Sequence, residues 1–196
     1  MTGIRRQEIS QALYRCIAKR GYSNTSVRNI AQEAGMRPGL IHHYFSSKDE
    51  ILAALTQDIF EKYWQRMSRL LEENEGRDLP ERLRVGIEFI FRQVAGDRDL
   101  VKVFHELWNL AEHDLELNES LRSMYRQYRN SVSVLLEEYL SENGVQDVNT
   151  KDLAALLVSA SEGASIQWFI DPMGISLSRL ATLASRLVET VAEAAT

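Results

Sequence analysis

Residues 25–48 read TSVRNIAQEAGMRPGLIHHYFSSK. The apolar side chains at the start of this stretch recur at i, i+3, i+4 and i+7, which places them on one face of a helix: Val27, Ile30, Ala31 and Ala34. Thr25 stands at the expected N-cap. Gly35 follows the last apolar residue, where a chain that leaves a helix turns left-handed at little cost. The stretch therefore predicts a short helix that ends at Ala34.

A second short helix is predicted from Pro38, because proline fixes a φ suited to a first helical turn and keeps Arg37 out of the α region. The expected packing side consists of Leu40, Ile41, Tyr44 and Phe45. Two short helices joined by a glycine turn form a helix-turn-helix, whose second helix lies in the major groove of DNA. The side chains left facing outward are Arg37, Gly39, His42 and His43, with Lys48 just beyond.

The same segment resembles the DNA-binding domain of the TetR family of bacterial transcriptional regulators. The elements that carry the resemblance occur in order and at fixed spacing: Thr25, Ile30-Ala31, Ala34-Gly35-Met36, Gly39, Leu40-Ile41, His42-His43-Tyr44-Phe45 and Ser47-Lys48-Asp49. Two residues depart from the family pattern. Arg37 replaces a small hydroxyl residue, and Leu40 stands where Thr, Ser or Ala is frequent, so base preference is expected to differ.

The resemblance implies a ligand-responsive transcriptional regulator, most often a repressor. We expect a homodimer that places two such helices in successive major grooves of an inverted-repeat operator and is released by a small-molecule effector. Arg37 is the expected base-edge contact, with Gly39 on the same outward surface. The expected phosphate contacts are Thr25, Arg28, Tyr44 and Lys48, and His42 and His43 could serve either purpose.

Charge is distributed unevenly along the chain. Residues 1–48 carry eight Lys or Arg and two Asp or Glu, a net +6, whereas the whole chain of 196 residues has a net charge of −5. The remaining residues hold 15 Lys or Arg and 26 Asp or Glu. Residues 1–48, hereafter the head, are therefore basic, and the rest of the chain is acidic. This asymmetry confines binding of a polyanion to the head.

Helical spacing continues to the end of the chain and predicts an all-α fold of about nine helices. We expect a DNA-binding domain of three helices over residues 1–48 and a helical effector-binding and dimerisation domain over 49–196. A capping box of Ser47 and Glu50 should open a long helix to about Glu73. The helices expected after it cover about 80–95, about 101–112, 117–143, 150–170 and 176–194, with Thr150 and Ser176 as caps.

The apolar residues of the last two expected helices cover more than the single stripe that a helix buries against its own core. The additional apolar face needs a second surface to cover it. Either they form a wholly internal hairpin, or two copies of the pair make a four-helix dimer interface, as the resemblance implies. The expected interface residues are Leu153, Leu156, Leu157, Ala160, Ala164, Leu180, Leu183, Ala184, Leu187 and Val191.

Aromatic and flexible side chains predict where an effector would bind, although such stripes are more often core than pocket. They are Trp64, Met67, Phe89, Phe104, Trp108, Tyr125, Tyr128 and Trp168. Glu162 interrupts an apolar helix, so with the three tryptophans it could form a cage for a cationic amine if it is buried. The carboxy-terminal layout is similar to the choline-responsive BetI type of regulator.

Other classes of function find less support. His105 and His113, with Glu106 and Glu112 beside them, lack the spacing of a known metal motif, and no phosphate-binding or dinucleotide-binding glycine motif occurs. We expect no cofactor and no metal. An adaptor controlled by a protein partner stays open as an alternative. The single cysteine, Cys16, is expected in the core, and the absence of a signal peptide or of 18 consecutive apolar residues favours the cytoplasm.

Overall fold

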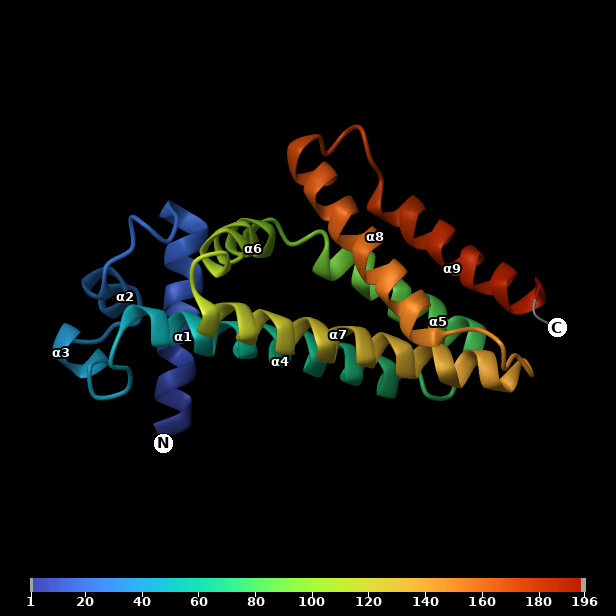
Figure 1. The fold of residues 1–196 in the computed structure, drawn as a ribbon, viewed down its shortest axis with the longest axis horizontal. Coiled ribbons are helices and arrows are strands. Elements are labelled where there is room, and N and C mark those ends of the chain that lie inside the picture. Colours follow the sequence, from blue (N-terminus) through green and yellow to red (C-terminus); the bar gives the residue numbers. More distant parts are fainter. Residues whose placement is uncertain (1, 195–196) are drawn as a thin grey trace. The chain divides into compact units, whose positions relative to one another are not determined.

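A computed structural model describes residues 2–194, and every regular element in that range is a helix (Figure 1). The elements are, in order, α1 (Thr2–Arg20), α2 (Val27–Glu33), α3 (Pro38–Ile41), α4 (Lys48–Glu73), α5 (Leu79–Glu88), η1 (Phe89–Val94), α6 (Arg98–Ala111), α7 (Leu115–Glu142), α8 (Thr150–Ile170) and α9 (Leu177–Ala194). The nine α-helices within this range confirm the predicted fold class.

Two details differ from the sequence-based expectation. The helix predicted to reach residue 95 ends as α-helix at Glu88 and continues as the π-helical segment η1, where the Ala95 amide donates to the carbonyl of Ile90 at 3.0 Å. Thr150 is the first residue of α8 and not its cap. The cap is Asn149, whose side chain accepts hydrogen bonds from the amides of Lys151 and Asp152.

The chain forms two compact units. The first contains the residues up to Lys62 together with Asp99–Tyr125, and the second contains Tyr63–Arg98 and the residues from Arg126 onward. The division therefore falls within α4, after the first residue of α6, and within α7.

The core of the first unit forms around one face of α1. Its residues have spacing typical of an amphipathic helix and are at most 2% exposed: Ile9, Ala12, Leu13, Cys16 and Ile17. Ile30 and Ala31 of α2 and Ile41 of α3 are buried in the same unit. Cys16 lies in the core as predicted, and burial raises the pKa of its thiol.

The second unit packs α5 and η1 against α9, and η1 also contacts α8. Gly86 on α5 makes close packing on α7 possible, because a Cβ there would lie 2.4 Å from Cδ2 of Leu135. Arg82 of α5 joins Glu138 of α7 through a 2.7 Å ion pair. Figure 1 shows α8 and α9 as the orange and red helices at the end of the chain.

Of the described helices, only α8 is long and apolar enough to cross a membrane by length and composition. The core helix of a soluble protein meets the same test.

Candidate functional site

The start of α2 is fixed by Ser26 and Asn29. The Ser26 side chain accepts from the Asn29 amide, and the Asn29 carboxamide oxygen accepts from the Ser26 amide at 2.9 Å, which completes a capping box. Thr25 was expected at this position and is not the cap. It is 3% exposed, and its hydroxyl donates to the carbonyl of Gly21 at 2.8 Å.

The turn between α2 and α3 follows the sequence prediction. Gly35 has a φ of +66°, the left-handed conformation that glycine adopts without strain. Arg37 is the N-cap of α3 with φ −75° and ψ 140°, Pro38 follows it, and the Arg37 side chain makes no capping hydrogen bond. The Arg37 guanidinium therefore forms no hydrogen bond with the first turn of α3.

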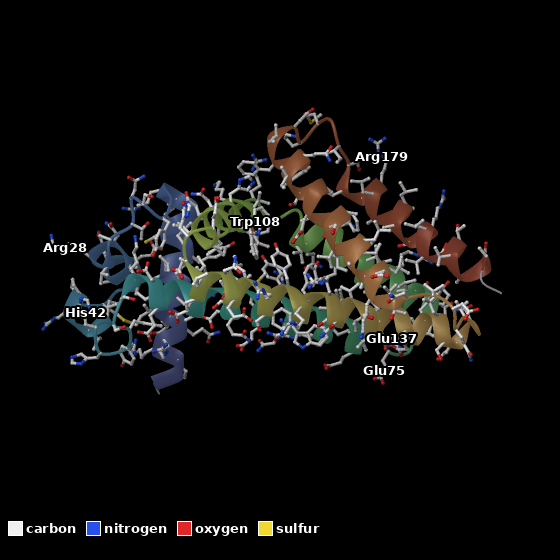
Figure 2. All side chains as sticks on the ribbon, viewed as in Figure 1. Arg28, His42, Glu75, Trp108, Glu137 and Arg179 are labelled. Atoms are coloured by element: carbon white, nitrogen blue, oxygen red, sulfur yellow. The ribbon has the colours of Figure 1, made fainter. Side chains whose placement is uncertain are left out.

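The helix α3 presents one buried and one exposed side. Ile41 and Phe45 are buried as predicted, and Tyr44 is half-buried. Leu40 was expected to pack inward and does not, because α3 has only four residues and Ile41 already occupies its inner face. The exposed side chains of this segment are those of Arg37, Pro38, Leu40, His42 and His43, with Gly39 also exposed. Figure 2 shows Arg28 of α2 and His42 at the same end of the first unit.

Several cations of the basic head are held by partners inside the first unit. Arg15 and Lys19 of α1 each form a 2.8 Å ion pair with Glu33 of α2, and the hydrogen bond from Lys19 is the main reason that the pKa of Glu33 is lowered. These ion pairs hold α1 against α2. Sequence analysis did not identify them, since the partners lie 14 and 18 residues apart.

Arg6 braces the junction between α3 and α4. Its guanidinium donates to the carbonyl of Tyr44, pairs with Glu50 at 3.1 Å and lies 3.9 Å from the ring centroid of Phe45. Glu50 accepts from the amide of Ser46 at 2.7 Å, and this bond is the largest cause of its lowered pKa. Half of the predicted capping box is therefore present: Ser47 Oγ accepts from the Glu50 amide, while the Glu50 carboxylate bonds Ser46 and not Ser47.

Lys48 joins the start of α4 to the connection between α1 and α2. Its Nζ donates to the carbonyls of Tyr22 and Thr25 at 3.1 and 3.0 Å and lies 3.6 Å from the ring centroid of Tyr22. Burial lowers the pKa of the Lys48 ammonium. The Tyr22 hydroxyl donates to Asp49, and burial is the main cause of its raised pKa. Two of the three Lys48 donors are thus used within the protein.

The cations left on the surface of the head are few. Within the described residues, Arg20, Arg28 and Arg37 form no hydrogen bond or ion pair through their side chains, and all three are exposed. His42 and His43 are exposed beside Arg37. Arg28 and Arg37, together with the exposed His42 and His43, make up the outward surface of α2 and α3, hereafter the α2–α3 surface.

In the first unit, the expected effector residues of α6 and α7 lie together. The ring centroids of Phe104 and Trp108 are 5.6 Å apart, and those of Phe104 and Tyr125 are 6.4 Å apart. Trp108 Nε1 donates to the Tyr125 hydroxyl at 3.0 Å. All three side chains are half-buried, so they form an aromatic cluster that is partly open.

In the second unit, the expected effector residues differ in environment. Met67 and Phe89 are buried in the core, whereas Trp64 is exposed. Burial raises the pKa of Tyr128, and Glu162 is half-buried. The faces of Trp168 and Phe169 are already near the Arg98 guanidinium, at 5.4 and 4.8 Å from the ring centroids. The face of Trp168, one of the three tryptophans of the amine-cage hypothesis, is thus already next to a cation of the protein itself.

No group of three or more His, Cys, Asp or Glu side chains that could hold a metal ion occurs in the part of the chain that the structure describes. His105 instead packs against Trp108, with ring centroids 5.6 Å apart.

Comparison with known proteins identifies the family of this chain. Residues 9–55 match the profile of bacterial regulatory proteins of the tetR family, and residues 80–193 match that of the BetI-type transcriptional repressor C-terminal domain. The chain belongs to the TetR family. The protein is therefore a DNA-binding transcriptional regulator of a family that is not enzymatic, and the resemblance seen in residues 25–49 is confirmed.

Individual relatives of this TetR-family protein have varied ligands. The transcriptional regulator PksA of Bacillus subtilis is 28% identical over 193 residues, covering 95% of this chain and 89% of its own. The nicotine-responsive repressor HdnoR of Paenarthrobacter nicotinovorans is 25% identical and covers 86% of this chain and 85% of its own. FadR of Bacillus subtilis, solved in complex with stearoyl-CoA, superimposes with a TM-score of 0.73 at 25% identity, covering 92% of this chain and 96% of its own.

Proposed function

We propose that this TetR-family regulator is a cytoplasmic homodimeric repressor that binds an inverted-repeat operator through two copies of α3 and leaves it when a small molecule binds. The observation that carries the proposal is an exposed apolar face on both carboxy-terminal helices. Leu156 on α8 is 53% exposed, and Leu183 and Leu187 on α9 are 63% and 42% exposed.

The ten predicted interface residues divide between two faces. Leu153, Leu157, Ala164 and Ala184 are buried within the protomer; Leu156, Ala160, Leu183 and Leu187 are exposed; and Leu180 and Val191 are half-buried. These helices thus do not form a wholly internal hairpin. A face with leucines one turn apart is expected to be covered by another apolar surface, and a second copy supplies a matching one.

A dimer matches the needs of DNA recognition. A four-residue helix with one arginine at its N-cap reads few base pairs, so an operator is recognised specifically when two copies bind at once. Binding through both heads raises the effective concentration of the second half-site. We assign base contact to Arg37 and phosphate contact to Arg28, with His42, His43 and Tyr44 beside them. Thr25 and Lys48 are reassigned to supporting the head, because their side chains bond Gly21, Tyr22 and Thr25.

Release follows if effector binding changes the separation of the two heads. Helix α4 starts at Lys48, three residues after Phe45, and runs to Glu73, so it contributes residues to both units. A shift of α4 would move the α2–α3 surface of each protomer, and simultaneous contact with both half-sites would be lost.

For the effector we propose a small molecule with an apolar or aromatic part. The support in the first unit is the partly open cluster of Phe104, Trp108 and Tyr125, which offers ring faces and a tyrosine hydroxyl. Among the relatives, a nicotine-responsive repressor and a regulator solved in complex with stearoyl-CoA are compatible with this class. Calorimetry with amines, acyl thioesters and aromatic acids tests it. A heat of binding with one of these classes that is abolished in Trp108→Ala supports the proposal. No heat of binding with any of the three classes contradicts it.

The dimer is tested by charge introduced into its apolar face. Leu183→Glu should convert the dimer to a monomer in light scattering and abolish operator binding, since a buried unpaired carboxylate is costly. The matched control is Thr182→Glu, an exposed neighbour 100° around the same helix, on the polar side of α9. A wild-type protein that is monomeric at micromolar concentration, or a Leu183→Glu variant that still protects two half-sites in a footprint, would overturn the proposal.

A further inference from the structure

Leu40 is the large apolar side chain that remains exposed on the segment that contacts DNA. It is 39% exposed, whereas Ile41 and Phe45 beside it are at most 2% exposed. Arg37, three residues before it, and His43, three residues after it, are also exposed. The Leu40 amide donates to the carbonyl of Arg37 at 2.9 Å, and the His43 amide donates to that of Leu40 at 3.2 Å, so the three residues stand at successive turns of the backbone. DNA that docks against α3 would cover the exposed part of Leu40.

The position of Leu40 relative to Arg37 limits what it can reach. Residues three apart on a helix have Cβ atoms about 5–6 Å apart. Successive base pairs in DNA are separated by about 3.4 Å. If Arg37 contacts the edge of one base pair, Leu40 lies at a base pair one or two steps away.

The chemistry of the major groove then selects the base. Each base edge there presents hydrogen-bond donors and acceptors, and the C5 methyl of thymine is its apolar group. Leucine offers no hydrogen bond, so placing it against a polar edge would leave that edge desolvated without a partner. Against thymine it buries a methyl group.

The residue before Leu40 favours close approach. A Cβ added to Gly39 would have no atom of the described protein within 4 Å, so no side chain fills the space next to Leu40 at this position. The groove edge can therefore come near the Leu40 side chain.

We propose that Leu40 is a specificity-determining residue that contacts a thymine methyl in each half-site, one or two base pairs from the base contacted by Arg37. The inference rests on the proposed docking of α3 in the major groove. It predicts that the operator has a thymine at that step and that removal of its methyl group weakens binding only when Leu40 is present.

The experiment uses the operator recovered from genomic fragments by the full-length protein. Each thymine of one half-site is replaced in turn by deoxyuridine, which lacks only the C5 methyl, and affinities are measured for wild type and for Leu40→Ala. Burying one methyl group corresponds to a change in affinity of about fourfold. One deoxyuridine should therefore weaken wild type about fourfold and leave the affinity of Leu40→Ala unchanged. Leu115→Ala, which removes an 89% exposed leucine of the same unit, is the control and should retain the sensitivity to deoxyuridine.

The outcomes separate this inference from the proposed function. If wild type selects an operator but no deoxyuridine affects it, or if Leu40→Ala has the same sensitivity, Leu40 does not contact a thymine methyl. If Leu40→Ala weakens operator and random DNA equally, the side chain packs on the sugar-phosphate backbone, which also overturns the inference. If wild type selects no operator at all, the proposed function fails first. Circular dichroism of Leu40→Ala confirms that the variant is folded.

Discussion

Replacing Lys48 with methionine removes an ammonium that links α4 to the connection between α1 and α2. The two hydrogen bonds from Nζ to the carbonyls of Tyr22 and Thr25 are 3.1 and 3.0 Å long, and the Tyr22 ring centroid is 3.6 Å away. A hydrogen bond from a charged donor contributes about 1.5–3 kcal/mol, and an exposed cation–π contact about 0.5–1 kcal/mol. Desolvation of the ammonium, which lowers the pKa of Lys48, opposes these gains.

The expected net effect of Lys48→Met is a decrease of about 2 kcal/mol in the free energy of unfolding. The effect on DNA binding separates a supporting role from a phosphate contact. Each lost phosphate contact reduces the slope of log affinity against log salt by about 0.9. A supporting Lys48 leaves that slope unchanged, while Arg28→Ala reduces it by about 0.9 per protomer and leaves stability near that of wild type.

The assay combines denaturant unfolding followed by circular dichroism with DNA titrations at several salt concentrations, at a temperature where every variant is folded. Arg28→Ala is the matched control, because it also removes one positive charge from the head. A Lys48→Met variant of wild-type stability with a reduced salt slope would refute the reasoning and restore Lys48 as a phosphate contact.

Three further variants test separate parts of the account. Arg37→Ala should reduce discrimination between the operator and random DNA by about 1–3 kcal/mol, and equal losses on both would remove its assigned role. Gly39→Ala should stabilise the free protein by up to about 1 kcal/mol, since the new Cβ has no atom within 4 Å, yet weaken operator binding; wild-type affinity in a gel shift would show that Gly39 does not face the groove. Asp58→Asn should raise stability at pH 7, because burial raises the pKa of this carboxyl and the ionised form is disfavoured in the folded state. That advantage should shrink as the pH falls through the folded-state pKa of Asp58 toward 3.8, its ordinary value, and a constant difference in denaturation across that range would be contrary evidence.

Local patterns predicted the helices and their glycine turn. The positive φ of Gly35 and the N-cap backbone of Arg37 follow from residue type alone, because few residues fit these conformations. Cap positions were displaced by one residue at Thr25 and Thr150. At each of these helix starts, two adjacent polar residues could serve as the N-cap. Which of them does so depends on its neighbours: at α2, the Asn29 side chain accepts a hydrogen bond from the backbone amide of Ser26.

Contacts between distant residues were not predictable from local patterns. Arg6 reaches the carbonyl of Tyr44, 38 residues away, and Lys48 reaches that of Tyr22, 26 residues away. The count of basic residues in the head therefore overstated the charge available to DNA. Leu40 was assigned to the core from its apolar character, but the length of α3 decides which side chains are covered.

The most direct test is a footprint of the full-length protein on fragments selected from the source genome, with scrambled competitor DNA at moderate ionic strength. The account predicts protection of two inverted half-sites about one helical turn, or a multiple of a turn, apart, and loss of protection in Leu183→Glu but not in Thr182→Glu. No preference for any genomic fragment over the competitor, or a protected site without two-fold symmetry, would contradict it.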